Sequence, residues 1–429
     1  MTRSFSLARS RASRTSASLA ATRLGVTLCC TFALTLACTS DDDDIPLTPG
    51  TGGTAGSGGG AGTGGGAGTG GGAGTGGSAG TGGGSSGPSG TIQVLSSDAA
   101  LRAPTTAAVR GNNLWVVNGQ LSGLFGGPAP VTPFNVVSVP LAGGAIGSDV
   151  VNLPGDTFYP EGIAAAADGT LYVGSLNLGT IVRVPADSFT PVAFVAAGIA
   201  ERGVIGLTVD EARGMLWFCD SNPTAPTPGG AIVGVDLDDG TETVRHAMPN
   251  PGASAADAGT PAADAGSDAG DAGTAPAPTP GVATFCNDLV VSSSGVIYAT
   301  DSTGGRIFRV PAANVITPNS AEVWLSVPEI GPPMPGGFGA NGIDLVGDSL
   351  VIANGNLVAV DPASSNPAST VRVFNLTLNG AAATLCGPDG LQTVPGSSTD
   401  VVVVENGGCA NPPGGDGDRV VRVTLDLDD

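Results

Sequence analysis

The 429-residue chain contains no lysine and a single histidine, His246. A Ser-His-Asp triad needs a histidine as its base, and a His-rich zinc site needs several histidines. Neither kind of site is therefore expected in this chain. His246 borders a run rich in Ala, Asp, Gly and Pro, and we expect it to be a surface residue. Any reaction is therefore expected to depend on oxygen-bearing side chains.

Basic residues are scarce: all 16 are arginines, against 37 acidic residues. Five of the arginines precede the first acidic residue, Asp41. A chain without that segment has 11 arginines against 37 acids, a net charge of −26. Such a charge repels phosphate backbones and anionic lipid surfaces, so we expect no nucleic acid partner and no membrane contact through the protein surface.

Residues 1–37 combine an arginine-rich, acid-free start with an apolar stretch from Leu24 to Ala37. The stretch is shorter than the ~20 residues that span a bilayer, so it predicts a cleaved secretory signal rather than a retained helix. Ala37 before Cys38 resembles the cleavage site of bacterial lipoproteins, which implies that Cys38 is acylated and anchors the protein at the bacterial cell envelope. Cleavage without a lipid is the alternative, because Thr35 stands where such sites usually carry leucine.

Two segments are predicted to lack a core of their own. Residues 38–90 contain an acidic run, Asp41 to Asp44, and continue as a Gly-, Thr- and Ala-rich tether. Residues 249–281 are rich in Ala, Asp, Gly and Pro, and their aspartates do not have the spacing of a calcium loop. Both segments bury too little apolar surface to order themselves, so we expect a disordered tether and a disordered insertion within a folded region at 91–429.

From Thr91 onward, short Val, Ile, Leu, Tyr and Trp runs alternate with Gly, Pro, Asn and Asp, which is typical of an all-β chain. The runs repeat as a head, a strand, a turn, a second strand ending in small or polar residues, and a third strand. The six heads are Thr105, Glu161, Ile205, Asn287, Asn341 and Asp389. This repeat predicts a six-bladed β-propeller. A two-layer sandwich is the alternative, but it does not need near-identical turn spacing.

The two ends of the folded region complement each other. The last unit supplies three strands, the third running from Arg419 to Leu425, whereas Thr91 to Leu95 is a lone strand before the first unit. Pairing this N-terminal strand with the C-terminal blade would close the propeller and cover exposed strand edges. We expect closure by that pairing.

Four cysteines follow Cys38, and no two of them form a CxxC pair; they are Cys219, Cys286, Cys386 and Cys409. In an exported protein such cysteines favour disulfides over zinc. Cys386 and Cys409 flank one hairpin of the last unit, which would leave Cys219 to pair with Cys286 across neighbouring blades. The sequence permits three connectivities, and free buried thiols are a further alternative.

Four heads place an oxygen-bearing side chain before a small or acidic residue; they are Glu161, Asn287, Asn341 and Asp389. Equivalent positions of a propeller converge on its axis, so these side chains are expected to meet there. Carboxylate and amide oxygens suit a hard cation such as Ca²⁺ or Mg²⁺. The alternative is that Asn-Gly and Asp-Gly pairs form turns for backbone reasons alone.

The ordered set Glu161-Gly162, Asn287-Asp288, Asn341-Gly342 and Pro388-Asp389-Gly390 resembles the blade heads of a known family. It is the gluconolactonase and senescence-marker-protein (regucalcin-like) family, which includes luciferin-regenerating enzymes, and the resemblance covers about residues 158–426. It implies a six-bladed propeller with a divalent cation held by Glu161, Asn341 and Asp389. Asn287 would contact the metal or the substrate, and Asp288 would lie at the substrate. It also implies that Asp389 helps to activate water for attack on a lactone carbonyl.

The chain departs from this family at Phe285, where lactonases of the family usually carry arginine to grip a sugar hydroxyl or acid. A sugar-acid lactone is therefore disfavoured as substrate. The leading hypothesis is an exported, lipid-anchored propeller that hydrolyses a small lactone or ester with a bound divalent cation. The competing hypothesis is a non-catalytic cell-surface propeller that binds a protein, peptide or glycan.

Overall fold

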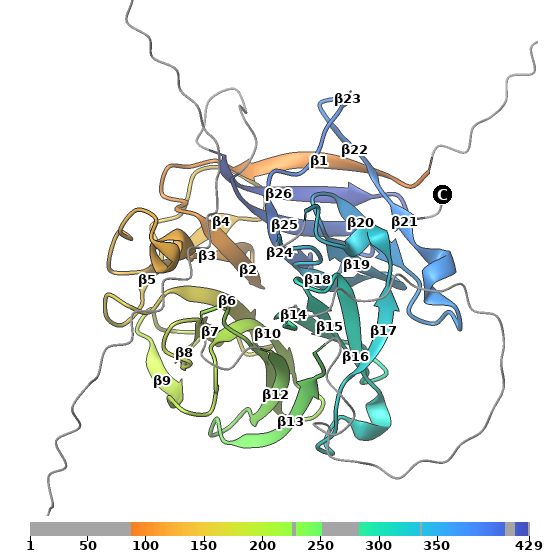
Figure 1. Ribbon diagram of the computed structural model, residues 1–429. Coiled ribbons are helices and arrows are strands. Elements are labelled where there is room, and N and C mark those ends of the chain that lie inside the picture. Colours follow the sequence, from red (N-terminus) through yellow and green to blue (C-terminus); the bar gives the residue numbers. More distant parts are fainter. Residues whose placement is uncertain (1–86, 225–228, 251–282, 335–336, 408–416, 428–429) are drawn as a thin grey trace, which may run out of the picture. The chain divides into compact units, whose positions relative to one another are not determined.

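Short strands form six sheets around a central axis (Figure 1). The computed structural model describes residues 87–224, 229–250, 283–334, 337–407 and 417–427. These residues belong to one unit, Gly80–Asp429, and the other unit, Met1–Ala79, contributes none of them. The predicted signal segment, Cys38, Cys409 and most of both predicted disordered segments lie outside the described residues.

Five of the sheets have four antiparallel strands in sequence order, so each strand is hydrogen-bonded to the next one along the chain. Their strands are β2 (Pro104–Arg110), β3 (Asn113–Asn118), β4 (Asn135–Pro140) and β5 (Val150–Asn152); β6 (Pro160–Ala165), β7 (Leu171–Ser175), β8 (Ile181–Val184) and β9 (Val192–Val195); β10 (Val204–Asp210), β11 (Met215–Asp220), β12 (Gly230–Asp236) and β13 (Glu242–Met248); β14 (Cys286–Val291), β15 (Ile297–Asp301), β16 (Arg306–Val310) and β17 (Glu322–Ser326); β18 (Ile343–Val346), β19 (Ser349–Ala353), β20 (Leu357–Val360) and β21 (Arg372–Val373). Each predicted head lies in the innermost strand of a sheet or directly before it, and the predicted all-β propeller of six blades is confirmed.

The sixth sheet contains strands from both ends of the described chain and runs in the order β23-β22-β1-β26-β25-β24. Its strands are β1 (Ser89–Ser96), β22 (Asn375–Leu378), β23 (Ala381–Ala382), β24 (Pro388–Thr393), β25 (Asp400–Asn406) and β26 (Asp418–Leu425). β1 pairs antiparallel with β26, from Gly90 opposite Leu425 to Ser96 opposite Val420, and it pairs in parallel with β22 on its other side. The β22–β23 hairpin therefore covers the edge that β1 would otherwise expose.

Helical structure in the described residues is limited to four short 3₁₀ turns. They are η1 (Leu121–Phe125), η2 (Ala312–Asn314), η3 (Pro328–Ile330) and η4 (Pro367–Thr370). Among the described residues there is no helix with the length and apolar character needed to cross a bilayer. The turns matter here because η1 and η3 lie in loops that reach the axial cavity described below.

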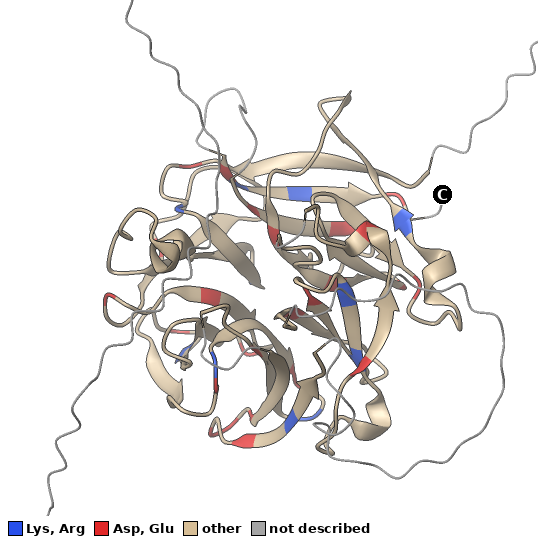
Figure 2. Ribbon diagram, in the orientation of Figure 1, with Lys and Arg blue, Asp and Glu red and all other residues tan. Residues whose placement is uncertain are grey.

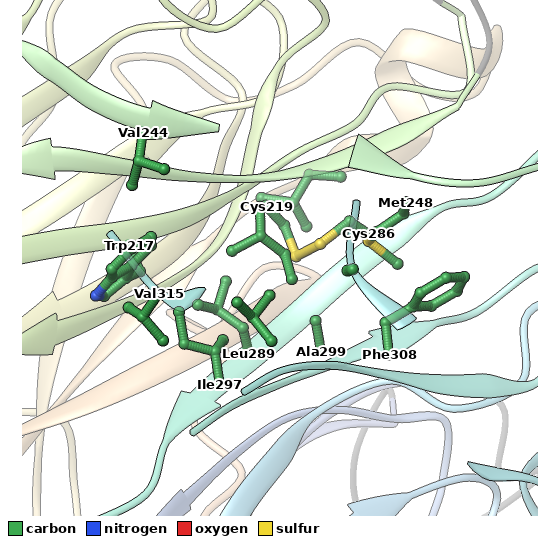
Figure 3. Packing of buried hydrophobic residues seen from close by; sticks show 14 of the residues in the cluster. Trp217, Cys219, Val244, Met248, Cys286, Leu289, Ile297, Ala299, Phe308 and Val315 are labelled. Atoms are coloured by element: carbon green, nitrogen blue, oxygen red, sulfur yellow. A yellow bond between two sulfur atoms is a disulfide. The ribbon is translucent and has the colours of Figure 1, made fainter. Parts of the chain in front are cut away.

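Apolar layers pack between neighbouring blades and hold the ring together. One such layer lies between the β10–β13 and β14–β17 blades and contains Trp217, Leu289 and Phe308, which are 3% exposed or less (Figure 3). Val- and Ile-rich strands fit this role because β-branched side chains pack well on a pleated surface. Burial of this kind is the main favourable term in the stability of the ring.

The same layer contains a disulfide between Cys219 of β11 and Cys286 of β14. It joins two neighbouring blades, and the predicted pairing of these two cysteines is confirmed. The pairing of Cys386 with Cys409 stays a prediction, because Cys409 lies outside the described residues.

Five of the six head residues lie at bulges in the innermost strands. In five of the six sheets the pairing register of the first strand shifts at the head. In β6 the shift falls between Pro160 and Ile163, so Glu161 and Gly162 together oppose one residue of β7. A bulge re-aims the side chain of its first residue and interrupts the alternation of the strand. Five of the heads therefore lie within inner strands, Asn341 lies two residues before β18, and none of the six lies in a turn.

Glycine follows the head in four blades because the next blade leaves no room for a side chain. A Cβ atom on Gly162 would lie 2.0 Å from the carbonyl oxygen of Ile205 in the next blade. The same approach recurs at Gly206, Gly342 and Gly390, where the nearest atoms of the next blade would lie 2.3–2.5 Å from a Cβ. None of the four has a left-handed φ. Glycine is therefore required at these positions because it lacks a Cβ atom. Its ability to adopt unusual backbone conformations plays no part here.

Buried acids at the ends of three second strands hold the segments that lead into the heads. Asp301 accepts the N–H of Phe285 at 2.9 Å, and its other oxygen accepts Nε of Arg306 at 2.9 Å. Asp220 and Glu405 make equivalent bonds to backbone N–H groups and to arginines in their own blades. Basic residues are few across the described blades (Figure 2), and the arginines in these ion pairs are already engaged.

The prediction that His246 is a surface residue is wrong. Its side chain is fully buried at the end of the outermost strand of its blade. Nδ1 lies 2.6 Å from Oδ1 of Asn319, Nε2 lies 2.9 Å from the carbonyl oxygen of Val315, and the ring stacks on Trp217. The histidine is buried because residues 312–320 of the next blade fold back over it and supply both of its hydrogen-bond partners.

Replacement of Gly162 with alanine tests the close approach of the inner strands. We expect Gly162→Ala to lower the free energy of unfolding by about 2 kcal/mol or more, since rigid backbone on both sides must move to admit the methyl group. Gly87→Ala is the matched control, because its Cβ would meet its nearest neighbour at an ordinary 3.7 Å. Denaturant unfolding of both variants measures the difference, and equal stabilities would contradict the proposed crowding.

Candidate functional site

Head side chains from all six blades line two cavities on the axis. A small one, of about 10 Å³, is lined by Thr105, Glu161, Asn287, Asn341 and Asp389, among others. A space of that size holds roughly one water molecule or one ion. A larger cavity, of about 630 Å³, shares Glu161, Asn287, Asn341 and Asp389 with it and adds Ile205. The structure thus brings together the four oxygen-bearing heads that the sequence singles out.

The walls of the larger cavity come from loops and are mainly apolar. They include Leu121 and Phe125 of η1, Leu176 after β7, Phe285 before β14, and Phe338. Prolines of the 328–333 segment complete one side. No arginine is among the described residues that line this cavity. The site is therefore an apolar cup with a polar floor, and its size falls in the range of small-molecule pockets.

Two carboxyl groups on the floor, those of Glu161 and Asp389, are buried close to each other. Burial raises the pKa of Glu161 well above its usual value, and the nearby charges of Asp389 and Asp288 raise it further. Burial also raises the pKa of Asp389, against the opposing effect of a hydrogen bond from Asn341. Neither carboxyl group forms an ion pair with any arginine in the described chain. The two acids consequently resist simultaneous ionisation unless another positive charge is present.

Asparagines fix the carboxyl group of Asp389. Nδ2 of Asn406 donates to Oδ2 of Asp389 at 2.5 Å, and the side chain of Asn341 also bonds it. Asn406 and Asn354 line the larger cavity and follow or end second strands. Sequence reasoning did not assign these two asparagines to the site. The signal was present in the repeat, since the second strand of each unit ends in small or polar residues.

Asp288 lines the small cavity, but both of its carboxylate oxygens already have backbone partners. Oδ1 accepts the N–H of Leu289 at 2.9 Å, and Oδ2 accepts the N–H of Ile343, in the next blade, at 3.2 Å. Burial raises its pKa to about 7 despite these bonds. Asp344 makes the same kind of bridge one blade further on, to the N–H of Thr393 at 2.6 Å. The bond to Ile343 bridges two blades and the bond to Leu289 is local, and a substrate contact of Asp288 stays a prediction.

Phe285 occupies the position where the resembling family usually has arginine, and it forms part of the cavity wall. Its ring meets that of Phe338 edge to face, with centroids 5.2 Å apart. Its backbone is held by Asp301, and the next residue, Cys286, is in the disulfide. The departure seen in the sequence therefore changes a potential cationic contact into a fixed aromatic surface.

The donor set on the floor suits a hard cation through two carboxylates and two amides. No group of three or more His, Cys, Asp or Glu side chains in the described residues has the arrangement of a metal site. Calcium sites, however, commonly take amide and backbone oxygens beside carboxylates. Glu161 and Asp389 can supply negative charge, and Asn287 and Asn341 can supply neutral oxygens, next to the small cavity. The residues present therefore fit a divalent cation.

The raised pKa values predict a stability that falls as pH rises in the absence of divalent cations. Between the ordinary and the raised pKa values the folded chain binds more protons than the unfolded chain, so the free energy of unfolding decreases as pH increases. We expect a loss on the order of 3 kcal/mol between about pH 5 and pH 8 in the presence of a chelator. Thermal and denaturant unfolding across that range measure it.

Glu161→Gln should flatten this pH dependence, because the substitution removes one of the mutually repelling acids. Glu329→Gln is the matched control, since Glu329 is exposed. A pH profile that stays the same in Glu161→Gln, or a stability that rises with pH in the wild type, would contradict the assignment.

Comparisons with known proteins give a short family match and a set of similar structures. The family profile described as "Strictosidine synthase-like, N-terminal" matches residues 147–184. No curated protein sequence matches the chain. The structural matches include proteins whose names are those of the family that the blade heads resemble.

A calcium-binding regucalcin from Agrobacterium tumefaciens is 13% identical, with a TM-score of 0.49, over 78% of this chain and 94% of its own. A gluconolactonase from Xanthomonas campestris is 13% identical, with a TM-score of 0.47, over 78% and 89%. A virginiamycin B lyase from Staphylococcus aureus is 12% identical, with a TM-score of 0.47, over 79% and 100%. Proteins with different activities are thus matched at similar levels, and no activity transfers to this chain from the likeness.

Proposed function

We propose that this protein is a metal-dependent hydrolase of a small lactone or ester, which binds in the axial cavity with its carbonyl group at the floor. One observation carries the proposal: two buried carboxyl groups without a basic partner in the described chain lie beside two amides at the bottom of an apolar cavity. Burial of charge in this way is unfavourable for folding and is typical of functional sites.

A divalent cation, with Ca²⁺ as our first choice, would be held by Glu161, Asn341 and Asp389, with Asn287 beside it. When bound, it would polarise the substrate carbonyl and offset the repulsion between the acids. Because the acids must lose their protons to hold it, we expect cation affinity to increase as pH rises toward neutrality.

Asp389 is the proposed general base. Asn406 and Asn341 orient its carboxylate. Burial raises its pKa, whereas a bound cation would lower it and keep the group ionised and able to accept a proton. The water oxygen bonds to the carbonyl carbon while its proton passes to Asp389. The bond between that carbon and the ring or ester oxygen then breaks, and the departing oxygen takes up a proton. The products are a hydroxy acid from a lactone, or an acid and an alcohol from an ester.

Hydrolysis of a panel of lactones and aryl esters, with added Ca²⁺ or with chelator, tests the reaction. We expect chelator to abolish turnover, and Asp389→Ala to lower it by at least about 100-fold, the range for loss of a general base. Asp156→Ala, at an exposed acid, is the control. Turnover that is insensitive to both chelator and Asp389→Ala would rule the mechanism out.

The competing function, a propeller that only binds, uses the same cavity and gives a different result in that experiment. Ligand binding without turnover, retained in Asp389→Ala, would favour it. In that case the cation would contribute stability only, and Ca²⁺ would raise the unfolding temperature without enabling a reaction.

We also propose that the protein is exported and lipid-anchored through Cys38. The support is the sequence of residues 1–38 alone. Wild-type protein expressed in a bacterium should partition into the detergent phase, and Cys38→Ala should move to the aqueous phase because it cannot carry the acyl chains. Equal partitioning of the two proteins would refute the anchor.

A further inference from the structure

We infer that the substrate of this cavity is uncharged and carries an apolar aromatic or alkyl group beside its lactone or ester bond. The inference rests on the proposed function for its reaction, and on the cavity walls for its substrate class. It assigns Phe285 and Phe338 as the residues that determine specificity.

The walls provide the first argument. Above the polar floor, the cavity is lined by Leu121, Phe125, Leu176, Phe285 and Phe338, together with prolines. These side chains offer no hydrogen bonds, and the amide N–H groups of the lining residues Asn354 and Asn406 already donate to protein oxygens. The hydroxyl groups of a sugar lactone would therefore lose water partners with few replacements. An alkyl or phenyl substituent would instead gain by leaving water.

The fixed position of Phe285 provides the second argument. Phe285 is 9% exposed and its N–H donates to Asp301. The disulfide through Cys286 ties the same segment to the preceding blade. Phe338 packs edge to face against Phe285 and is 50% exposed at the rim. A wall that is held from behind in this way presents the same aromatic surface to every ligand, which favours selection by shape.

Charge provides the third argument. The floor has two acidic residues, and no arginine is among the described lining residues. The nearby Arg306 is 5% exposed and bonded to Asp301, so it is not available to a ligand. With Ca²⁺ bound, the charges of Glu161 and Asp389 would balance those of the cation. A substrate with a free carboxylate or phosphate would therefore find no net positive charge at the floor and no arginine among the described lining residues, which is unfavourable.

The test compares two lactones of the same ring size, one with an alkyl or phenyl substituent and one with hydroxyl groups, on the full chain with Ca²⁺. We expect kcat/KM to favour the apolar lactone by about tenfold or more, the range given by a few apolar contacts. Phe285→Arg and Phe338→Ala should both reduce this ratio. Phe189→Ala should leave it unchanged, since Phe189 is an exposed aromatic outside the cavity.

Binding separates this inference from the proposed reaction. Calorimetry with a non-hydrolysable cyclic ether or ketone that carries the same substituents reports substrate class without turnover. Preferential binding of the apolar analogue without hydrolysis of any lactone or ester would uphold the substrate class and defeat the reaction. A hydroxylated or anionic lactone turned over as well as the apolar one would overturn the substrate class and leave the reaction intact. A kcat/KM ratio between the two lactones that is the same in wild type, Phe285→Arg and Phe338→Ala would also overturn the substrate class.

Discussion

The fold depends on how closely the innermost strands approach one another around the axis. At Gly162 and its three counterparts, atoms of the next blade lie where a Cβ on the glycine would be, so the ring closes at these positions only with a residue that lacks a side chain. At the equivalent position of the β14–β17 blade, Asp288 replaces glycine and bridges to the N–H of Ile343. Crowding and polar bridging are thus two solutions to the same contact between neighbouring inner strands.

This constraint also creates the site. Because the second residue of each bulge has to fit against the next blade, the first residue is turned toward the axis, where Glu161 and Asp389 meet with little solvent. Their mutual repulsion opposes folding, and the apolar layers between the blades and the buried ion pairs offset it. A cation would remove the conflict. Under the proposed function, stability and cation binding therefore make opposite demands on the same few atoms.

Much of this was predictable from the sequence because the repeat is local. Strand runs, turn spacing and the recurring heads predict six blades, and the convergence of Glu161 and Asp389 follows from equivalence by ring closure. The cavity walls were not predictable, since Leu121 and Phe338 lie in loops with no repeated pattern. The burial of His246 was missed for a similar reason: its partners come from a loop of the next blade, about seventy residues away in the chain. Among the wall residues, only Phe285 was singled out from the sequence, because the resembling family usually has arginine at that position.

The shared blade at the ends of the described chain has a consequence for how this propeller can be built into larger proteins. The N–H of Asp426 donates to the carbonyl oxygen of Ser89 at 2.8 Å, so the first and last strands start and finish side by side. A short linker would therefore join the two strands. The chain could then be circularly permuted, with new termini at another blade boundary and the same order of sheets around the axis. For the same reason the whole ring can be grafted into a surface loop of a host protein, entering and leaving at nearly the same point.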